Sequence, residues 1–150
     1  MIKENIAEVL KNINDACKRT GRNPDEVTLL AVSKTKPVSM LEEAYSLGIR
    51  DFGENYVQEL TDKITQCSDD IKWHMIGHLQ RNKVKYIVGD VYLIHSVDSL
   101  RLAEEISRIS VKKNVCSDIL IEVNVAEEDS KFGITIENAI SVTEDIAKLS

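Results

Sequence analysis

Two periodicities of apolar and polar residues alternate along this chain. Short apolar runs typical of strands are separated by amphipathic segments in which apolar residues return every three or four positions. The first amphipathic segment covers residues 2–20 and predicts a helix that ends at Gly21. The first apolar run, residues 28–33, predicts a buried strand.

The rest of the chain repeats this strand–helix unit. Further strands are predicted at residues 49–52, 72–76, 91–95 and 119–125. Helices are predicted at residues 40–47, 56–67, 79–88, 99–110 and 136–149, with Ser39 as the cap of the first of these. Short apolar strands that alternate with helices predict an α/β fold with a parallel sheet. This pattern fits both an open doubly wound sheet and a (β/α)₈ barrel.

Composition and charge narrow the class of protein. With 150 residues, of which 43% are hydrophobic and 29% charged, the chain is long and apolar enough for one folded domain. A net charge of -6 argues against a nucleic-acid binder. No apolar run approaches a membrane span, and Glu4 and Glu8 interrupt the start where a signal peptide would be apolar. Three widely spaced cysteines favour reduced thiols and a cytoplasmic location.

The first predicted strand is followed directly by Lys34, then by Lys36 and Pro37. Apolar walls and a second cation nearby disfavour the ammonium form of Lys34, and a neutral amine can attack a carbonyl. Lys36 precedes a proline, which places it in an extended loop outside the sheet. Schiff-base chemistry on Lys34 is therefore the first hypothesis. The alternative is a solvated lysine that only marks the end of the core.

Polar residues also follow the other predicted strands. Asn55 follows the second strand, and His74 and His78 lie in and after the third. Because the carboxyl ends of parallel strands share one edge, this convergence predicts a binding site. Asn55 could instead cap the next helix, and a hydrogen-bonded core position is the simpler interpretation of His74. Gly77 and the strand pattern argue against a His74–His78 metal pair, so no metal site is expected. Neither a dinucleotide nor a P-loop fingerprint is present.

Three segments resemble signatures of the pyridoxal phosphate homeostasis protein family. They are residues 30–37 (LAVSKTKP), 52–59 (FGENYVQE) and 73–83 (WHMIGHLQRNK), and residues 96–99 and 124–133 fall where that family has further motifs. The resemblance implies a barrel like the N-terminal domain of alanine racemase, with pyridoxal 5'-phosphate (PLP) held as an internal aldimine on Lys34. Asn55, His74 and Met75 match positions near the cofactor.

The same resemblance implies a function without catalytic turnover. Members of this family are regarded as PLP-binding proteins that balance the cofactor pool, so the small molecule and PLP-dependent apoenzymes are the expected partners. The alternative is a PLP-dependent amino-acid racemase or decarboxylase. A racemase of this fold needs a second acid or base on the opposite cofactor face, normally from another domain, and this chain has no room for one.

The chain is shorter than the family leads one to expect. A full (β/α)₈ barrel takes about 250 residues, and only five strand–helix units are predicted here. Residues 1–150 are therefore expected to form the N-terminal part of a single PLP-binding barrel domain, truncated before its C-terminal units. In the family the segments that hold the cofactor phosphate lie in those units.

Overall fold

A single parallel sheet organises the computed structural model, which describes residues 1–129 and 131–150. Ser130, within the segment 124–133 that falls where the family has a further motif, lies outside the described residues. The main sheet has the strand order β1-β2-β3-β4-β5. Its strands are β1 (Ala31–Val32), β2 (Asp51–Glu54), β3 (Lys72–Met75), β4 (Leu93–Val97) and β5 (Ile119–Ile121). A small parallel sheet pairs β6 (Val123–Asn124) with β7 (Ile134–Thr135).

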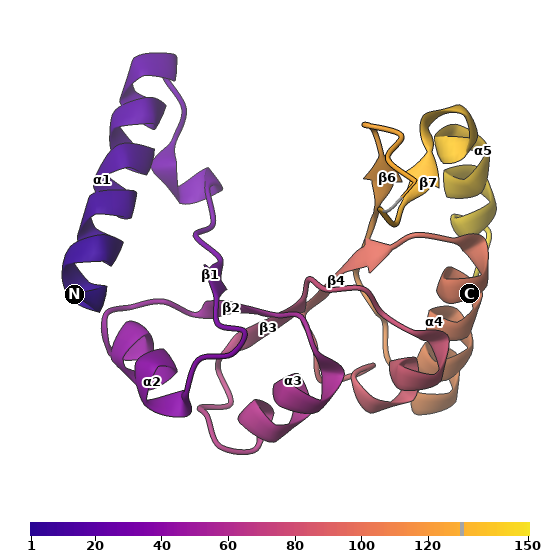
Figure 1. Cartoon of the computed structure of the whole chain (residues 1–150), viewed down its shortest axis with the longest axis horizontal. Coiled ribbons are helices and arrows are strands. Elements are labelled where there is room, and N and C mark those ends of the chain that lie inside the picture. Colours follow the sequence, from indigo (N-terminus) through magenta and orange to yellow (C-terminus); the bar gives the residue numbers. More distant parts are fainter. Residues whose placement is uncertain (130) are drawn as a thin grey trace.

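Helices connect the strands. The α-helices are α1 (Ile2–Thr20), α2 (Val38–Ser46), α3 (Val57–Ile64), α4 (Leu100–Lys113) and α5 (Ile136–Ile146). Two short 3₁₀ helices complete the order, η1 (Pro24–Glu26) and η2 (Arg81–Tyr86). Figure 1 shows the helices along the outer side of a curved sheet, whose inner face is open.

The strand order decides between the two architectures that the sequence allowed. A doubly wound sheet reverses its strand order at a switch point, whereas barrel strands follow one another in sequence. Here the five strands run in sequence without a reversal, and each neighbouring pair is parallel. The predicted α/β fold is therefore confirmed as barrel-type, with five strands that curve around an open inner face.

The helices α1 and α4 begin or end at residues that are typical of helix caps. Ser99 caps α4 by accepting a hydrogen bond from the Leu102 amide at 3.3 Å, and Asn114 ends this helix in the left-handed conformation. Gly21 ends α1 in the same conformation, as predicted. The helices predicted at residues 2–20 and 99–110 thus begin and end within a few residues of their expected positions.

Three predictions about local structure were wrong. Ser39 is not a cap, because α2 begins at Val38 with Pro37 in the cap position. The helix predicted at residues 79–88 is instead the 3₁₀ helix η2 over Arg81–Tyr86, with bonds between residues three apart, and its Val84 is buried in the core. The strand predicted at residues 119–125 divides at Glu122, whose amide bonds to β4 and whose carbonyl accepts from β7.

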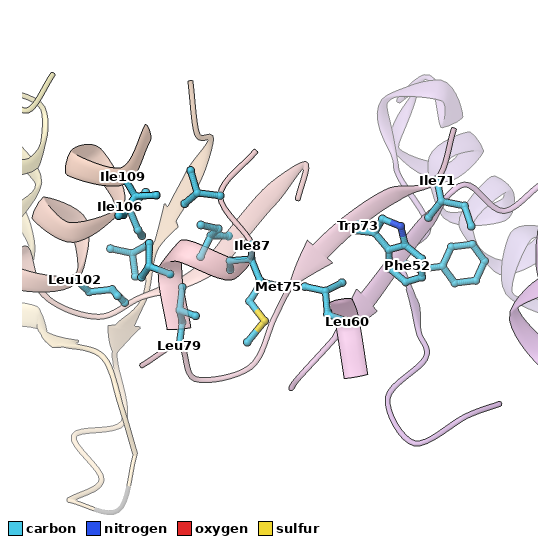
Figure 2. Close-up of a cluster of buried hydrophobic side chains, with 14 of the residues drawn as sticks. Phe52, Leu60, Ile71, Trp73, Met75, Leu79, Ile87, Leu102, Ile106 and Ile109 are labelled. Carbon is cyan, nitrogen blue, oxygen red and sulfur yellow. The ribbon is translucent and has the colours of Figure 1, made fainter. Parts of the chain in front are cut away.

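The hydrophobic core lies between the sheet and its outer helices. Phe52 and Trp73 pack ring against ring on neighbouring strands, with centroids 6.1 Å apart. Figure 2 shows these rings with Met75 and Leu60 and, farther along, the aliphatic side chains of α4. Burial of these side chains drives the helices onto one face of the sheet. The opposite, inner face of the sheet is not covered by these helices (Figure 1).

Candidate functional site

The register of the strands defines which side chains lie on the inner face. Val32, Gly53, His74 and Leu93 occupy one row across β1 to β4. Side chains alternate along a strand, so residues two positions away share this face. Val32 is 53% exposed although it lies in the predicted buried strand, because the inner face carries no cover among the described residues.

Lys34 lies in the turn that follows β1, two positions beyond Val32. The predicted location at the carboxyl end of the strand is confirmed. The predicted apolar enclosure was wrong, because Lys34 is exposed. Only β2 pairs with β1 within the described residues, which leaves the turn open to solvent. Lys36 is exposed and lies outside the sheet, as expected from Pro37.

A buried ion-pair network lies directly beneath this turn. The Lys63 ammonium of α3 donates to Glu54 Oε1 and Glu59 Oε1, both at 2.7 Å, and to the Ser33 carbonyl oxygen at 2.8 Å. The Ser33 hydroxyl donates to Glu54 Oε1 at 2.6 Å. Glu59 Oε1 also accepts the Thr35 amide at 2.6 Å. The network therefore joins α3 and β2 to the turn that carries Lys34.

The two carboxylates keep Lys63 charged although it is buried. Burial works to lower the pKa of Lys63, but the hydrogen bonds and charges of Glu54 and Glu59 outweigh burial and raise the pKa above its ordinary value. Glu54 is fully buried and Glu59 is 24% exposed. A fixed cation with two carboxylate partners and one carbonyl acceptor thus lies behind the strand end.

His74 takes part in a hydrogen-bonded chain on the inner face. Its Nε2 lies 3.0 Å from Asp51 Oδ1, and its Nδ1 lies 2.9 Å from His95 Nε2. A carboxylate can only accept, so His74 donates through Nε2 to Asp51, and its Nδ1 shares a hydrogen bond with His95 Nε2. Burial, and then the charge of His74, lower the pKa of His95 below its ordinary value. These hydrogen bonds confirm the interpretation of His74 as a hydrogen-bonded interior histidine.

Asn55 lies at the strand end of β2, in close contact with the backbone at Gly77, which follows β3. A side chain at Gly77 would overlap the main chain of Asn55, with 2.7 Å to its Cα atom. Asn55 does not cap α3, since Tyr56 occupies the cap position and no side chain accepts a bond there. The alternative interpretation of Asn55 as a cap was therefore wrong.

A pocket of about 480 Å³ opens beside Asn55. It is lined by Asn55, Tyr56, Val57, His78, Gln80 and Lys83. No carboxylate lines it, and Lys83 and His78 bring cationic or hydrogen-bonding groups. The pocket lies where β2 and β3 end, which is the edge at which the sequence predicts a site.

Met75 and His78 lie apart from the inner-face row. Met75 is fully buried and packs in the core between sheet and helices (Figure 2). The His78 ring stacks on Phe132 with centroids 3.7 Å apart, and its Nδ1 is 3.4 Å from Asp98. Within residues 1–129 and 131–150, no group of three His, Cys, Asp or Glu side chains is arranged to hold a metal ion.

The sequence analysis did not identify the Lys63 network or the partners of His74. Glu59 and Lys63 are four residues apart on α3, a spacing that favours ion pairs on a helix, and this signal was available. Glu54 belongs to the network only because β2 passes beneath the turn after β1. Asp51 and His95 join His74 from two neighbouring strands, a contact that local sequence does not reveal.

Known proteins match this chain over nearly its whole length. The model of the alanine racemase N-terminal domain family matches residues 5–150. A pyridoxal phosphate homeostasis protein from Aquifex aeolicus is 46% identical over 136 residues, which cover 90% of this chain and 60% of that protein. The chain thus spans about three fifths of the length of this curated relative.

Two solved structures are also similar. A protein of unknown function from Bifidobacterium adolescentis superposes with a TM-score of 0.90 at 34% identity, over 99% of this chain and 65% of that one. PipY of Synechococcus elongatus, solved with PLP bound, superposes with a TM-score of 0.80 at 32% identity, over 100% of this chain and 66% of that one. These likenesses agree with the barrel-type fold.

Proposed function

This chain belongs to the alanine racemase N-terminal domain family, and from that premise we propose that it binds PLP as a Schiff base on Lys34 and serves PLP homeostasis without catalytic turnover. The carrying observation is Lys34 itself, the lysine in the turn directly after the carboxyl end of β1. Relatives named as PLP homeostasis proteins and the PLP-bound PipY support the assignment.

The groups at the strand ends fit this cofactor. The aldehyde of PLP would form an imine with an amine. Exposed Lys34 offers such an amine, in a turn whose Thr35 amide is bound by Glu59. The neutral amine adds to the aldehyde carbon and water leaves, so neither an oxidant nor a reductant is needed. Asn55 and the pocket beside it offer polar side chains without a carboxylate to repel an anionic ligand.

The other site residues take supporting places in this proposal. His74 is held by Asp51 and His95 on the inner face, where it would line the floor of the site. The Met75 side chain packs in the core, so we assign it to the support of the pocket wall. Asn55 follows β2, the strand beside β1, and lines the pocket.

The setting of the protein is part of the same proposal. None of the helices in the described part of the chain combines the length and the apolar character that a membrane crossing requires. Cys17, Cys67 and Cys116 are free thiols, which supports a cytoplasmic setting. PLP-dependent apoenzymes are the proposed recipients of the cofactor. That residues 1–150 form one part of a larger PLP-binding domain stays a prediction.

Replacing each of the two lysines near β1 with alanine tests the proposal. With PLP added, the wild type is expected to show an imine absorbance band that Lys34→Ala abolishes and Lys36→Ala retains. The reason is that Lys34 directly follows the strand end, in a turn bound by Glu59 and Lys63, whereas Lys36 precedes Pro37 and lies farther outside the sheet. Equal spectra for both variants and the wild type would contradict the assignment.

The absence of turnover has its own test. PLP-loaded protein is incubated with single amino-acid enantiomers in D₂O, and proton NMR follows the α-proton. We expect no sustained exchange, because a Schiff-base carrier needs only reversible imine formation. Steady exchange that depends on Lys34 would show catalysis and would favour a racemase or decarboxylase instead.

A further inference from the structure

The ion-pair network beneath the turn does more than fill a buried space. Ser33 contributes the peptide carbonyl that precedes Lys34, and Thr35 contributes the peptide amide that follows it. Lys63 binds the first group at 2.8 Å, and Glu59 binds the second at 2.6 Å. The orientations of these two peptide planes set the backbone dihedral angles of Lys34 itself.

We propose that Glu59 and Lys63 are positioning residues for the Lys34 amine. This inference rests on the proposed function. Both residues act through the main chain on either side of Lys34 and not by contact with the cofactor. An amine that must meet an aldehyde gains from a fixed starting geometry, because less freedom is lost when the bond forms.

The backbone of the turn gives independent support. Thr35 has a φ of 61°, in the left-handed region that threonine rarely adopts. Such a conformation persists where surrounding contacts hold it. Here the hydrogen bond from the Thr35 amide to Glu59 is such a contact.

The Lys63 ammonium is held in turn from several elements. Glu54 of β2 is fully buried and bonds both Lys63 and the Ser33 hydroxyl. The Ser33 amide continues the sheet by donating to the Gly53 carbonyl at 2.9 Å. The turn is thus anchored by β2 on one side of Lys34 and by α3 on the other.

Glu59 is the residue to change, because it is partly exposed and its loss leaves the buried Glu54–Lys63 pair intact. Glu59→Ala removes the acceptor of the Thr35 amide. Glu59→Gln keeps an acceptor oxygen without the charge. Asp62→Asn is the matched control, since Asp62 is an exposed carboxylate of the same helix and bonds only Gln58 through its side chain.

The first readout is amide hydrogen exchange without PLP. Glu59→Ala is expected to raise the exchange rate of the Thr35 amide by about tenfold, the effect of losing one charge-assisted bond. The Ser33 amide, which bonds within the sheet, should keep its protection. A general loss of stability would speed exchange at both positions, so this contrast separates positioning from a merely structural role.

The second readout is the affinity of the protein for PLP, measured by imine absorbance. Glu59→Ala is expected to weaken it by about tenfold, and Glu59→Gln should restore most of the loss. Unchanged affinity in Glu59→Ala relative to Asp62→Asn overturns the positioning role and leaves the proposed function standing. If the wild type itself forms no imine with PLP, both the positioning role and the proposed function are overturned.

Discussion

Replacing Lys63 with methionine is expected to lower the free energy of unfolding by about 3–5 kcal/mol. Methionine fills a similar volume but leaves the Glu54 carboxylate buried without its cation. Urea denaturation of the two proteins, analysed by linear extrapolation, measures the difference. A loss below about 1 kcal/mol would contradict the view that this ion pair is integral to the fold.

Two comparisons sharpen that measurement. Lys148→Met removes an exposed lysine paired with Asp145 and is expected to cost less than about 1 kcal/mol. The pKa of Lys63 is raised in the folded protein, so its contribution is present below the unfolded pKa of about 10.4 and is lost as pH rises through the folded value. The gap between wild type and Lys63→Met should therefore narrow only above about pH 10.

Gly77→Ala is the second substitution with a large expected effect, a loss of about 3 kcal/mol or more in the free energy of unfolding. The added Cβ would lie 2.7 Å and 2.8 Å from main-chain carbons of Asn55, and backbone cannot move aside as a side chain can. The ends of β2 and β3 would have to separate. Asn55 would move with them, so the affinity for PLP should fall as well.

Gly53→Ala provides the matched control. Its Cβ would lie 2.9 Å from Ile76 Cδ1, the far end of a flexible side chain that can rotate away. We expect a cost of about 1 kcal/mol, near the low end for overpacked sites. Equal losses for Gly53→Ala and Gly77→Ala, again from urea denaturation, would contradict the importance of the contact between Gly77 and Asn55.

The sequence predicted the architecture well where local signals act. The helices α1 and α4 combine clear apolar periodicity with end signals such as Gly21 and Ser99. Such signals depend on residues near in sequence, which is why they could be found. The 3₁₀ helix η2 and the short strands β6 and β7 depend on tertiary packing, and two-residue strands leave almost no periodicity to detect.

The candidate site was predictable only in part. The end of an apolar run located Lys34, and this needs no knowledge of the fold. Its exposure was not foreseen, because burial depends on which elements cover the inner face. The contacts of Glu54 with Ser33 and Lys63 join three elements that are 9 to 30 residues apart in sequence. Only the three-dimensional structure brings those residues together.

The most direct test of the account is chemical labelling of the amine. The full chain is incubated with PLP, reduced with sodium borohydride to make the imine permanent, digested, and mapped by mass spectrometry. The account predicts a pyridoxyl group on Lys34. Its appearance on another lysine such as Lys36, or on none, would contradict the account.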